Sequence, residues 1–253
     1  MSESVDRRVL GAFRCVDAIT GNSVMDPLPV SGSQLTLRPN RSGIYVIFNA
    51  PGLASLTTQF DPPGAWPAPS SFEVSIQDPT RRYLPRRAQV RAPQEPVSGT
   101  EPAPVLSPQT VTLYPAAAAA VGANWAVVHV SVVLAGTNPP HGLPWPVVRV
   151  LLAADNSVLA TGAGDARGEA LLAVPGIGVQ VNAGGGGAVL QSNIAVVVQA
   201  WFDPSALTQP AGWVPNPDDL LSNLAAVGLK TATQSATLGA GQRIAISLSI
   251  SVS

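Results

Sequence analysis

The chain has 253 residues, of which 46% are hydrophobic and 11% are charged, and its formal net charge is −1. This length suffices for one large or two ordinary domains, and the near-zero charge excludes a global field that would attract nucleic acid or a membrane surface. The 23 glycines and 25 prolines fall between apolar runs, which favours short strands joined by tight turns over a disordered chain.

The N-terminal part of the chain predicts a β-sandwich. A first strand is expected at residues 7–18, and a strong apolar strand at residues 44–48 ends at a Pro-Gly pair. Residues 72–76 alternate between apolar and polar side chains, which is typical of a half-buried strand. We therefore expect a first, arginine-rich sandwich domain over residues 1–94.

The following residues, 95–109, predict a linker. They carry four prolines and two glutamates, and proline-rich segments of this kind are extended and semi-rigid. The remainder, residues 110–253, is then expected to form a second domain at a defined spacing from the first.

Within this second part, residues 147–176 show the clearest alternation of predicted strands and turns. An apolar strand, an Asp-Asn turn, a second strand, a turn ending in Asp165-Ala166-Arg167-Gly168 and a third strand follow one another before a Pro-Gly stop. This succession of short strands and turns is typical of a small antiparallel β-sandwich. Residues 125–134 are almost continuously apolar, so we expect them in the middle of the sandwich. The chain as a whole is predicted to be all-β, with two tandem antiparallel β-sandwich domains.

One short helix is expected in the second domain, at Pro217–Val227. Asn216 supplies an N-cap, Pro217 suits the first turn, and the acidic pair Asp218 and Asp219 lies near the positive end of the helix. Gly228 supplies a stop.

The final strand, residues 242–252, has one fully apolar face and one face of small polar residues. Edge strands normally carry charges that prevent pairing with other chains, and the small polar face formed by Ala245, Ser247, Ser249 and Ser251 has none. Two interpretations remain open. The strand is covered within its own domain, which we favour, or it joins a neighbour by strand addition.

The sequence offers no constellation for catalysis. Its two histidines, His129 and His141, have no metal-ligand spacing, and its one cysteine, Cys15, lies in an apolar strand pattern and leaves no partner for an internal disulfide. No Gly-x-Ser-x-Gly elbow and no phosphate-binding loop occur. We expect no enzyme activity, no cofactor and no metal.

Three acidic residues near turns, Asp155, Asp165 and Glu169, raise the question of a calcium site. Aspartate and glycine at these positions are also the residues that tight turns require. We favour the turn interpretation.

A basic cluster is the sharpest feature predicted for the surface. It consists of four arginines around an aromatic residue and a proline, with one further arginine downstream. We expect it to dock an acidic partner surface, because a single short cluster at this net charge does not make a nucleic-acid binder. The residues of this predicted docking site are Arg81, Arg82, Tyr83, Arg86, Arg87 and Arg91.

Three tryptophans in proline-rich loops, Trp66, Trp145 and Trp213, support an alternative function. Loop tryptophans stack on sugars, anchor protein interfaces or close the open ends of a sandwich. The alternative is a stand-alone module that binds a carbohydrate or a cell surface through these residues.

The segment from Val147 to Gly176 resembles the carboxypeptidase-regulatory-like, transthyretin-like β-sandwich family. The resemblance lies in the strand VVRVLL and the turn that follows it. It also includes the turn Asp165-Ala166-Arg167-Gly168-Glu169 and the strand after it, which ends in Val-Pro-Gly. It covers about thirty residues of the chain. The resemblance implies an immunoglobulin-like or transthyretin-like sandwich that is structural and not catalytic.

Two N-terminal pieces, residues 37–48 and 78–86, resemble β-sandwich proteins encoded with phage-tail-like extracellular contractile injection systems. This resemblance implies a structural or adaptor subunit at the cap or baseplate of a tube-and-sheath particle. Its partners would be other protein subunits, copies of itself included, with no nucleic acid and no insertion into a membrane.

A cytoplasmic location is expected on two grounds. The N-terminal sequence shows no basic segment followed by an apolar one, and no apolar run reaches the ~18 residues that span a bilayer. We expect the protein to be assembled in the cytoplasm and released, if at all, as part of a particle.

Overall fold

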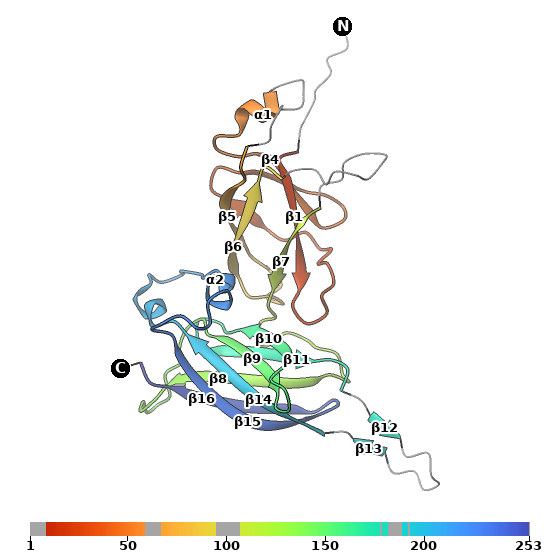
Figure 1. Ribbon diagram of the computed structural model, residues 1–253, viewed down its shortest axis with the longest axis vertical. Coiled ribbons are helices and arrows are strands. Elements are labelled where there is room, and N and C mark those ends of the chain that lie inside the picture. Colours follow the sequence, from red (N-terminus) through yellow and green to blue (C-terminus); the bar gives the residue numbers. More distant parts are fainter. Residues whose placement is uncertain are drawn as a thin grey trace. The chain divides into compact units, whose positions relative to one another are not determined.

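The computed structural model of the protein describes residues 9–58, 67–94, 107–177, 179–181, 189–191 and 193–252. The chain divides into two compact units, and each is described by itself. Unit 1 comprises Met1–Pro79 and Pro85–Leu113, and unit 2 comprises Thr80–Leu84 and Tyr114–Ser253. Both are built from β-sheets with only short helices, which confirms the predicted all-β fold (Figure 1).

Unit 1 consists of two sheets, with strand orders β3-β4-β1-β7 and β2-β5-β6. Its interior is formed by alternate residues of these strands. In β6, for example, the side chains at 86, 88, 90 and 92 are buried while those at 89 and 91 are exposed. The strands are β1 (Gly11–Asp17), β2 (Val30–Gly32), β3 (Thr36–Pro39), β4 (Ile44–Asn49), β5 (Ser70–Ile76), β6 (Arg86–Ala92) and β7 (Gln109–Leu113).

Unit 2 also consists of two sheets, with strand orders β10-β9-β14-β15 and β11-β8-β16. A hairpin of β12 and β13 is inserted between β11 and β14. The strands are β8 (Ala126–Leu134), β9 (Val147–Leu152), β10 (Val158–Ala163), β11 (Glu169–Val174), β12 (Val179–Val181), β13 (Val189–Gln191), β14 (Asn193–Phe202), β15 (Lys230–Gly239) and β16 (Arg243–Ile250).

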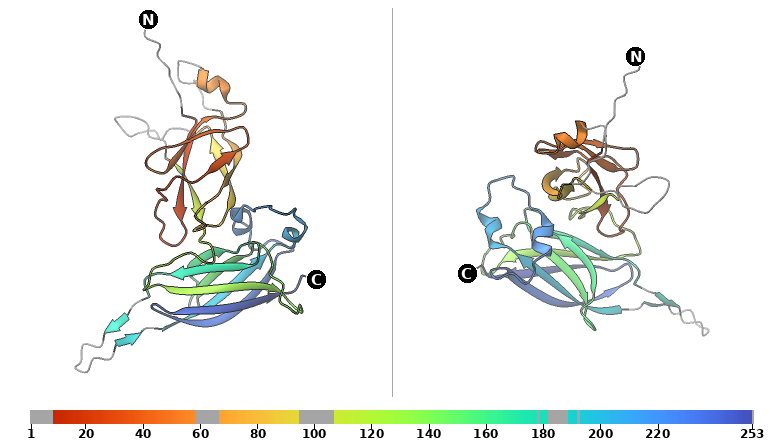
Figure 2. Two further views of the ribbon diagram at one scale, coloured as in Figure 1. Left: turned by 180° about the vertical axis from the view of Figure 1, so that it is seen from behind. Right: turned by 45° about the horizontal axis from the view of Figure 1, so that its top comes forward.

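The core of unit 2 lies between its two sheets. Valines of β8, isoleucines and Leu248 of β16, and Leu172 of β11 contact residues of β9 and β14 from the facing sheet, among them the fully buried Phe202. Figure 2 shows these two layers of unit 2 from two further directions. Burial of so many branched side chains between two sheets is the main stabilising contribution to a sandwich.

The two units share one strand order except for the third strand. In each, the first strand lies between the fourth strand and the last strand of the sandwich: β1 between β4 and β7, and β8 between β11 and β16. The first strand pairs antiparallel with the fourth and parallel with the last. Each sandwich thus adds one parallel pair, which the sequence did not predict, to its antiparallel pairs. The third strand distinguishes the units, because β3 pairs with β4 whereas β10 pairs with β9.

The division into units differs from the predicted boundary. Strand β7 begins at Gln109 and pairs with β1, so residues 110–113 belong to the first sandwich and not to the second. Residues 95–106 of the predicted linker lie outside the described residues.

The predicted helix begins where expected but ends early. Helix α2 spans Pro217–Leu221, with Asn216 as its N-cap accepting a hydrogen bond from the backbone N–H of Asp218. The N–H of Asn223 then bonds to the carbonyl of Leu220, three residues back, so the chain tightens into turns. Two further short helices were not predicted, α1 (Ala54–Thr58) in unit 1 and the 3-10 helix η1 (Pro204–Thr208) in unit 2.

Candidate functional site

The six residues of the predicted docking site are divided between the two units. Arg81, Arg82 and Tyr83 belong to unit 2, and Arg86, Arg87 and Arg91 belong to unit 1. The two groups are therefore described separately.

In unit 2, the short segment Thr80–Leu84 is fastened to residues 114–116. The N–H of Leu84 donates to the carbonyl of Tyr114, the N–H of Ala116 donates to the carbonyl of Arg82, and Tyr83 forms a β-bridge with Pro115. Tyr83 is buried, and the guanidinium carbon of Arg82 lies 5.1 Å from the centroid of its ring. Arg82 and its neighbour Arg81 are exposed. This segment thus presents two arginines on a fixed backbone.

In unit 1, Arg86 does not belong to any exposed docking site. Its side chain is 1% exposed, and its Nη1 and Nε donate to the backbone carbonyls of Thr112 and Arg87. The sequence interpretation placed it on the surface because of its charge. Its position in the alternation of β6, however, places it on the same inward face as Ala88 and Val90.

Arg86 also influences the buried Cys15. Burial raises the pKa of the Cys15 thiol to about 12, and the nearby charge of Arg86 lowers it by a smaller amount. A thiol in this environment is protonated at neutral pH and is a poor nucleophile.

The other two arginines of the predicted docking site in unit 1, Arg87 and Arg91, differ in their contacts and exposure. Arg87 forms an ion pair with Glu73 on the neighbouring strand β5, with 3.3 Å between Nη1 and Oε2. Arg91 is exposed, and its backbone is held by the side-chain amide of Gln109. Of the three predicted residues in unit 1, Arg91 therefore presents the most accessible charge.

The tryptophans predicted for the alternative ligand site occupy separate loops. Trp66 lies outside the described residues. Trp145 and Trp213 are half-buried, and the backbone N–H of each is held by a carbonyl, that of Asp165 and that of Pro210 respectively. Both belong to unit 2.

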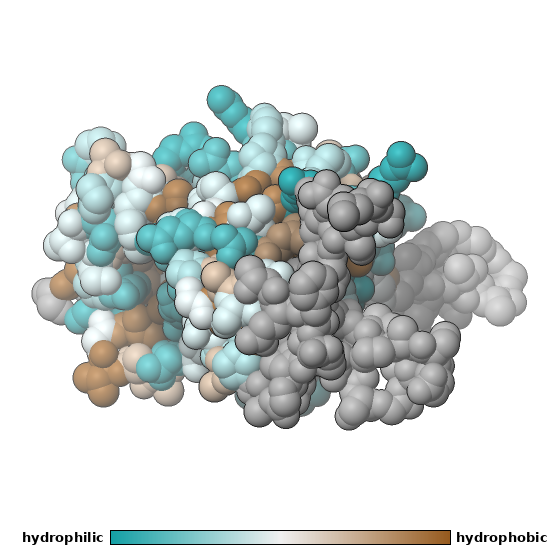
Figure 3. All heavy atoms as spheres, turned by 90° about the horizontal axis from the view of Figure 1, so that it is seen from above, coloured by the Kyte–Doolittle hydropathy of each residue, from teal (hydrophilic) through white to brown (hydrophobic). Residues whose placement is uncertain are grey.

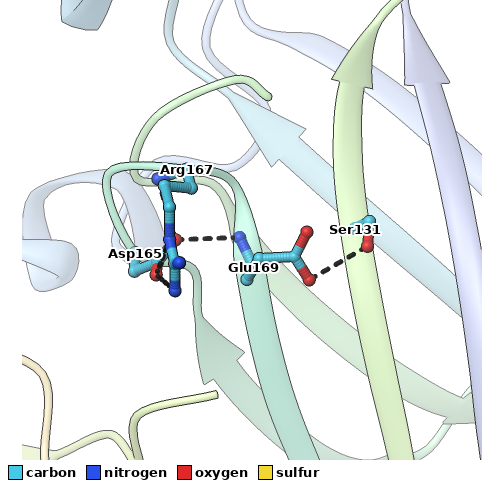
Figure 4. Close-up of polar contacts among 4 residues, drawn as sticks. All are labelled: Ser131, Asp165, Arg167 and Glu169. Atoms are coloured by element: carbon cyan, nitrogen blue, oxygen red, sulfur yellow. Dashed lines mark hydrogen bonds and ion pairs between the residues drawn. The ribbon is translucent and has the colours of Figure 1, made fainter. Parts of the chain in front are cut away.

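The acidic residues considered for calcium are engaged in turn hydrogen bonds. The Oδ1 of Asp165 accepts from the backbone N–H groups of Arg167 and Glu169 at 2.8 and 3.0 Å, and its Oδ2 contacts the Arg167 guanidinium (Figure 4). Glu169 accepts from the hydroxyl of Ser131. Within the described residues no group of three or more His, Cys, Asp or Glu side chains has a metal-binding arrangement.

Asp155 shows the same use of a carboxylate in a turn. It accepts hydrogen bonds from Ser157, and these lower the pKa of Asp155, the side-chain bond first and the backbone bond second. Both observations support the turn interpretation of these acidic residues.

Strand β16 lies at the edge of its sheet. It pairs with β8 on one side, and no other strand of the described part of the chain pairs with its second side. The outward residues Ala245, Ser247 and Ser249 are exposed. The expectation that this strand is covered within its own domain is therefore wrong for its serine face.

Exposed hydrophobic residues are few in the described part of the chain. The large ones are Met25, Val158, Leu207 and Val227, which are far apart in the sequence. Figure 3 shows hydrophilic and hydrophobic side chains interspersed over the face seen from above. No helix among the described residues has the length and apolar character needed to cross a membrane.

One arginine and one aromatic residue of unit 2 were missed by the sequence interpretation. The guanidinium carbon of Arg149, on β9, lies 5.8 Å from the centroid of the Trp201 ring on β14. The sequence signal that could have identified this pair is Arg149 itself, the single charged residue in the otherwise apolar strand VVRVLL.

Comparison with known proteins gives little further information. No family model matches the sequence, and no curated protein matches it. Among solved structures, the TIE protein of Bacillus anthracis is similar over 96% of this chain at 8% sequence identity, with a TM-score of 0.26. The chain spans 34% of the length of that protein. A likeness of this degree carries no argument about function, so the function must be argued from the residues themselves.

Proposed function

We propose that the chain is a non-catalytic structural or adaptor subunit that docks within a large protein assembly. The observation that carries this proposal is the open edge of β16. A strand at a sheet edge offers backbone N–H and C=O groups to which an extended segment of another chain can pair.

The register identifies which backbone groups face the open edge. The carbonyls of Gln242 and Ile250 accept from the N–H groups of Val127 and Ala135, so the even-numbered residues between them direct their backbone groups toward β8. Backbone direction alternates along a strand. The backbone groups of Ala245, Ser247 and Ser249 therefore face the open edge.

The side chains around this edge favour pairing. Natural edge strands avoid association through lysines, inward charges or prolines. The outward side chains from residue 245 to residue 249 are alanine and serine, which are small and uncharged and do not obstruct an incoming strand. The exposed Arg81 and Arg82 of the same unit offer a contact for acidic residues of a partner.

The kind of assembly is proposed from the sequence resemblance. Residues 37–48 and 78–86 resemble proteins of phage-tail-like contractile injection systems, so we assign the chain to the cap or baseplate region of such a particle, assembled in the cytoplasm. Its partners are other protein subunits of the particle or further copies of the chain. The resemblance of residues 147–176 to a non-catalytic sandwich family supports a structural role.

The experiment compares the parent chain with Ser247→Pro. Proline at this position removes one N–H from the open edge and leaves the β8 pairing intact, while Ser247→Thr is the matched control. Each tagged protein is purified gently from its native host, imaged by negative-stain electron microscopy, and its companions are identified by mass spectrometry.

The proposal expects tube-and-sheath particles with the parent chain and with Ser247→Thr, and a folded but unincorporated Ser247→Pro protein. A parent chain that elutes as a monomer without companions would overturn the assembly role. Incorporation of Ser247→Pro into particles would show that the β16 edge is not the surface through which the chain docks.

A second candidate function is a stand-alone module that binds a carbohydrate or cell surface. Trp145 and Trp213 favour it, since both retain partial exposure in loops. Substituting both by alanine separates the two functions. Loss of binding on a glycan array with assembly intact would support the second candidate.

A further inference from the structure

The side chain of Arg149 has a polar atom that the protein itself does not satisfy. Its Nε is buried and has no hydrogen-bond partner, and it is the one such side-chain nitrogen or oxygen among the described residues. Buried donors are nearly always paired, because an unpaired one loses its bonds to water without replacement. An arginine with a buried and unpaired Nε therefore requires an explanation.

The residue lies near the centre of the four-stranded sheet of unit 2, on its outer face. Val148 and Val150, its neighbours along β9, point into the core, so Arg149 points outward. The register places it in one row with Thr161 of β10, Gln199 of β14 and Thr233 of β15. Neutral hydrogen-bonding side chains thus lie on both sides of the guanidinium.

The guanidinium is held in place by Trp201. This tryptophan is 7% exposed, and its ring lies 5.8 Å from the guanidinium carbon, within the range of a cation–π contact. Neither terminal nitrogen of Arg149 donates a hydrogen bond within the described residues, yet only Nε is both buried and unpaired. It follows that Nη1 and Nη2 are not fully buried and retain contact with solvent.

No carboxylate on this face neutralises the charge. Strands β9, β10, β14 and β15 contain no Asp or Glu. Asp218 and Asp219 of α2, the helix packed against β9, form no ion pair with Arg149 in the described structure. A partly desolvated cation without a counter-ion is costly, and a carboxylate that binds both terminal nitrogens would offset that cost.

We infer that Arg149 is the anchor of a docking site for an acidic side chain of a partner protein, which binds the two terminal guanidinium nitrogens beside Gln199 and Thr161. One isolated cation matches the single charge of a carboxylate, whereas a phosphate group is usually met by several arginines. The outer face of a sheet suits a protein segment better than a small molecule, which needs a concave pocket. Arginine and tryptophan are also the residues that most often dominate protein interfaces. This inference does not depend on the proposed assembly role.

The test is a nuclear magnetic resonance titration of the full chain, at low ionic strength, with an extended peptide of alternating Glu and Thr. The site predicts that shift changes centre on the Arg149 Nε–H, the Gln199 amide and the Trp201 indole. Arg149→Gln should weaken binding by about tenfold or more, equivalent to ~1.4 kcal/mol. Arg41→Gln, which removes an exposed arginine of unit 1 outside the predicted docking site, should leave it unchanged.

Several results would overturn the inference. These are shift changes that miss β9 and β14, equal weakening by Arg41→Gln, equal binding of a peptide in which Gln replaces Glu, or stronger binding of a phosphoserine peptide. The shift map of the parent chain tests the site even if Arg149→Gln fails to fold.

Discussion

The side-chain amide of Gln94 forms the two hydrogen bonds with the backbone of Ala12 that a neighbouring strand would otherwise form. Its Oε1 accepts from the N–H of Ala12 at 2.9 Å, and its Nε2 donates to the carbonyl of the same residue at 3.0 Å. The pairing of β1 with β7 begins one residue later, at Phe13, so the amide continues the ladder where β7 is absent. Gln109 makes the same pair of bonds to the backbone of Arg91 in β6.

Replacing Gln94 by leucine should destabilise unit 1 by ~1–3 kcal/mol, because two partly buried backbone groups of Ala12 lose their partners. Gln89→Leu, at an exposed position of β6, is the control and should change stability by less than ~0.5 kcal/mol. Hydrogen exchange of the Ala12 amide reports the effect directly. Unchanged protection of that amide in Gln94→Leu would contradict the proposed role of the side chain.

Much of the fold could be predicted from alternation along single strands. The final strand and residues 72–76 show this, because their period of two appears without any knowledge of neighbours. The same alternation places Arg86 on the buried face of Ala88 and Val90, whereas its charge favours an exposed position, so the two signals conflict at this residue.

The parts that could not be predicted depend on pairing between distant segments. The parallel pairing of β1 with β7 joins residues almost one hundred positions apart, and it transfers residues 110–113 to the first unit. The contact between Arg149 and Trp201 likewise depends on the register of β9 and β14. No local pattern specifies such a register, since it results from the packing of the whole core.

Gly142→Ala should be among the most destabilising single-methyl changes in unit 2. A Cβ at Gly142 would lie 1.8 Å from the carbonyl oxygen of Arg167, and a backbone atom cannot move aside as a side chain can. We expect a loss of at least ~3 kcal/mol in the free energy of unfolding.

Gly136→Ala is the matched control for this substitution. Gly136 has a φ of +78° and nothing within 4 Å of the added carbon, so only the backbone strain of about 1 kcal/mol is expected. Urea denaturation of both variants measures the difference. A loss at Gly142 no larger than that at Gly136 would show that the loop relaxes.

The carboxylate of Asp165 should matter for its turn and not for its ion pair. Asp165→Asn keeps an oxygen that accepts from the N–H groups of Arg167 and Glu169, so it should cost less than ~1 kcal/mol, whereas Asp165→Ala should cost ~1–2 kcal/mol. Arg167→Ala removes the ion pair of a side chain that is 79% exposed and should have almost no effect. If thermal denaturation ranks Arg167→Ala as the most damaging, the ion pair stabilises the turn instead.

Cys15 should react with thiol reagents only when unit 1 opens. Its side chain is buried and its pKa is raised to about 12, so little thiolate exists in the folded state at neutral pH. In the unfolded chain the thiol ionises near its ordinary pKa of 9.0, and unfolding therefore releases a proton above that pH. The contribution of Cys15 to stability is complete below pH 9.0 and declines as the pH rises toward 12. Cys15→Ala should weaken this alkaline decline, and rapid labelling of the folded parent chain would disprove the burial.

Arg86 and Arg87 are adjacent in the sequence, but replacement by methionine should destabilise the protein far more at Arg86 than at Arg87. Arg86→Met removes a fully buried guanidinium and its hydrogen bonds to the partly buried carbonyls of Thr112 and Arg87, so we expect a loss of ~3 kcal/mol or more in the free energy of unfolding. Arg87→Met removes an ion pair to Glu73 in which both side chains retain exposure, and it should cost no more than ~1 kcal/mol. Chemical denaturation followed by circular dichroism compares the two. Equal, small losses would mean that Arg86 leaves the core easily and can still act at the surface, and a large loss at Arg86 alone would confirm that its buried hydrogen-bonded side chain stabilises the sandwich.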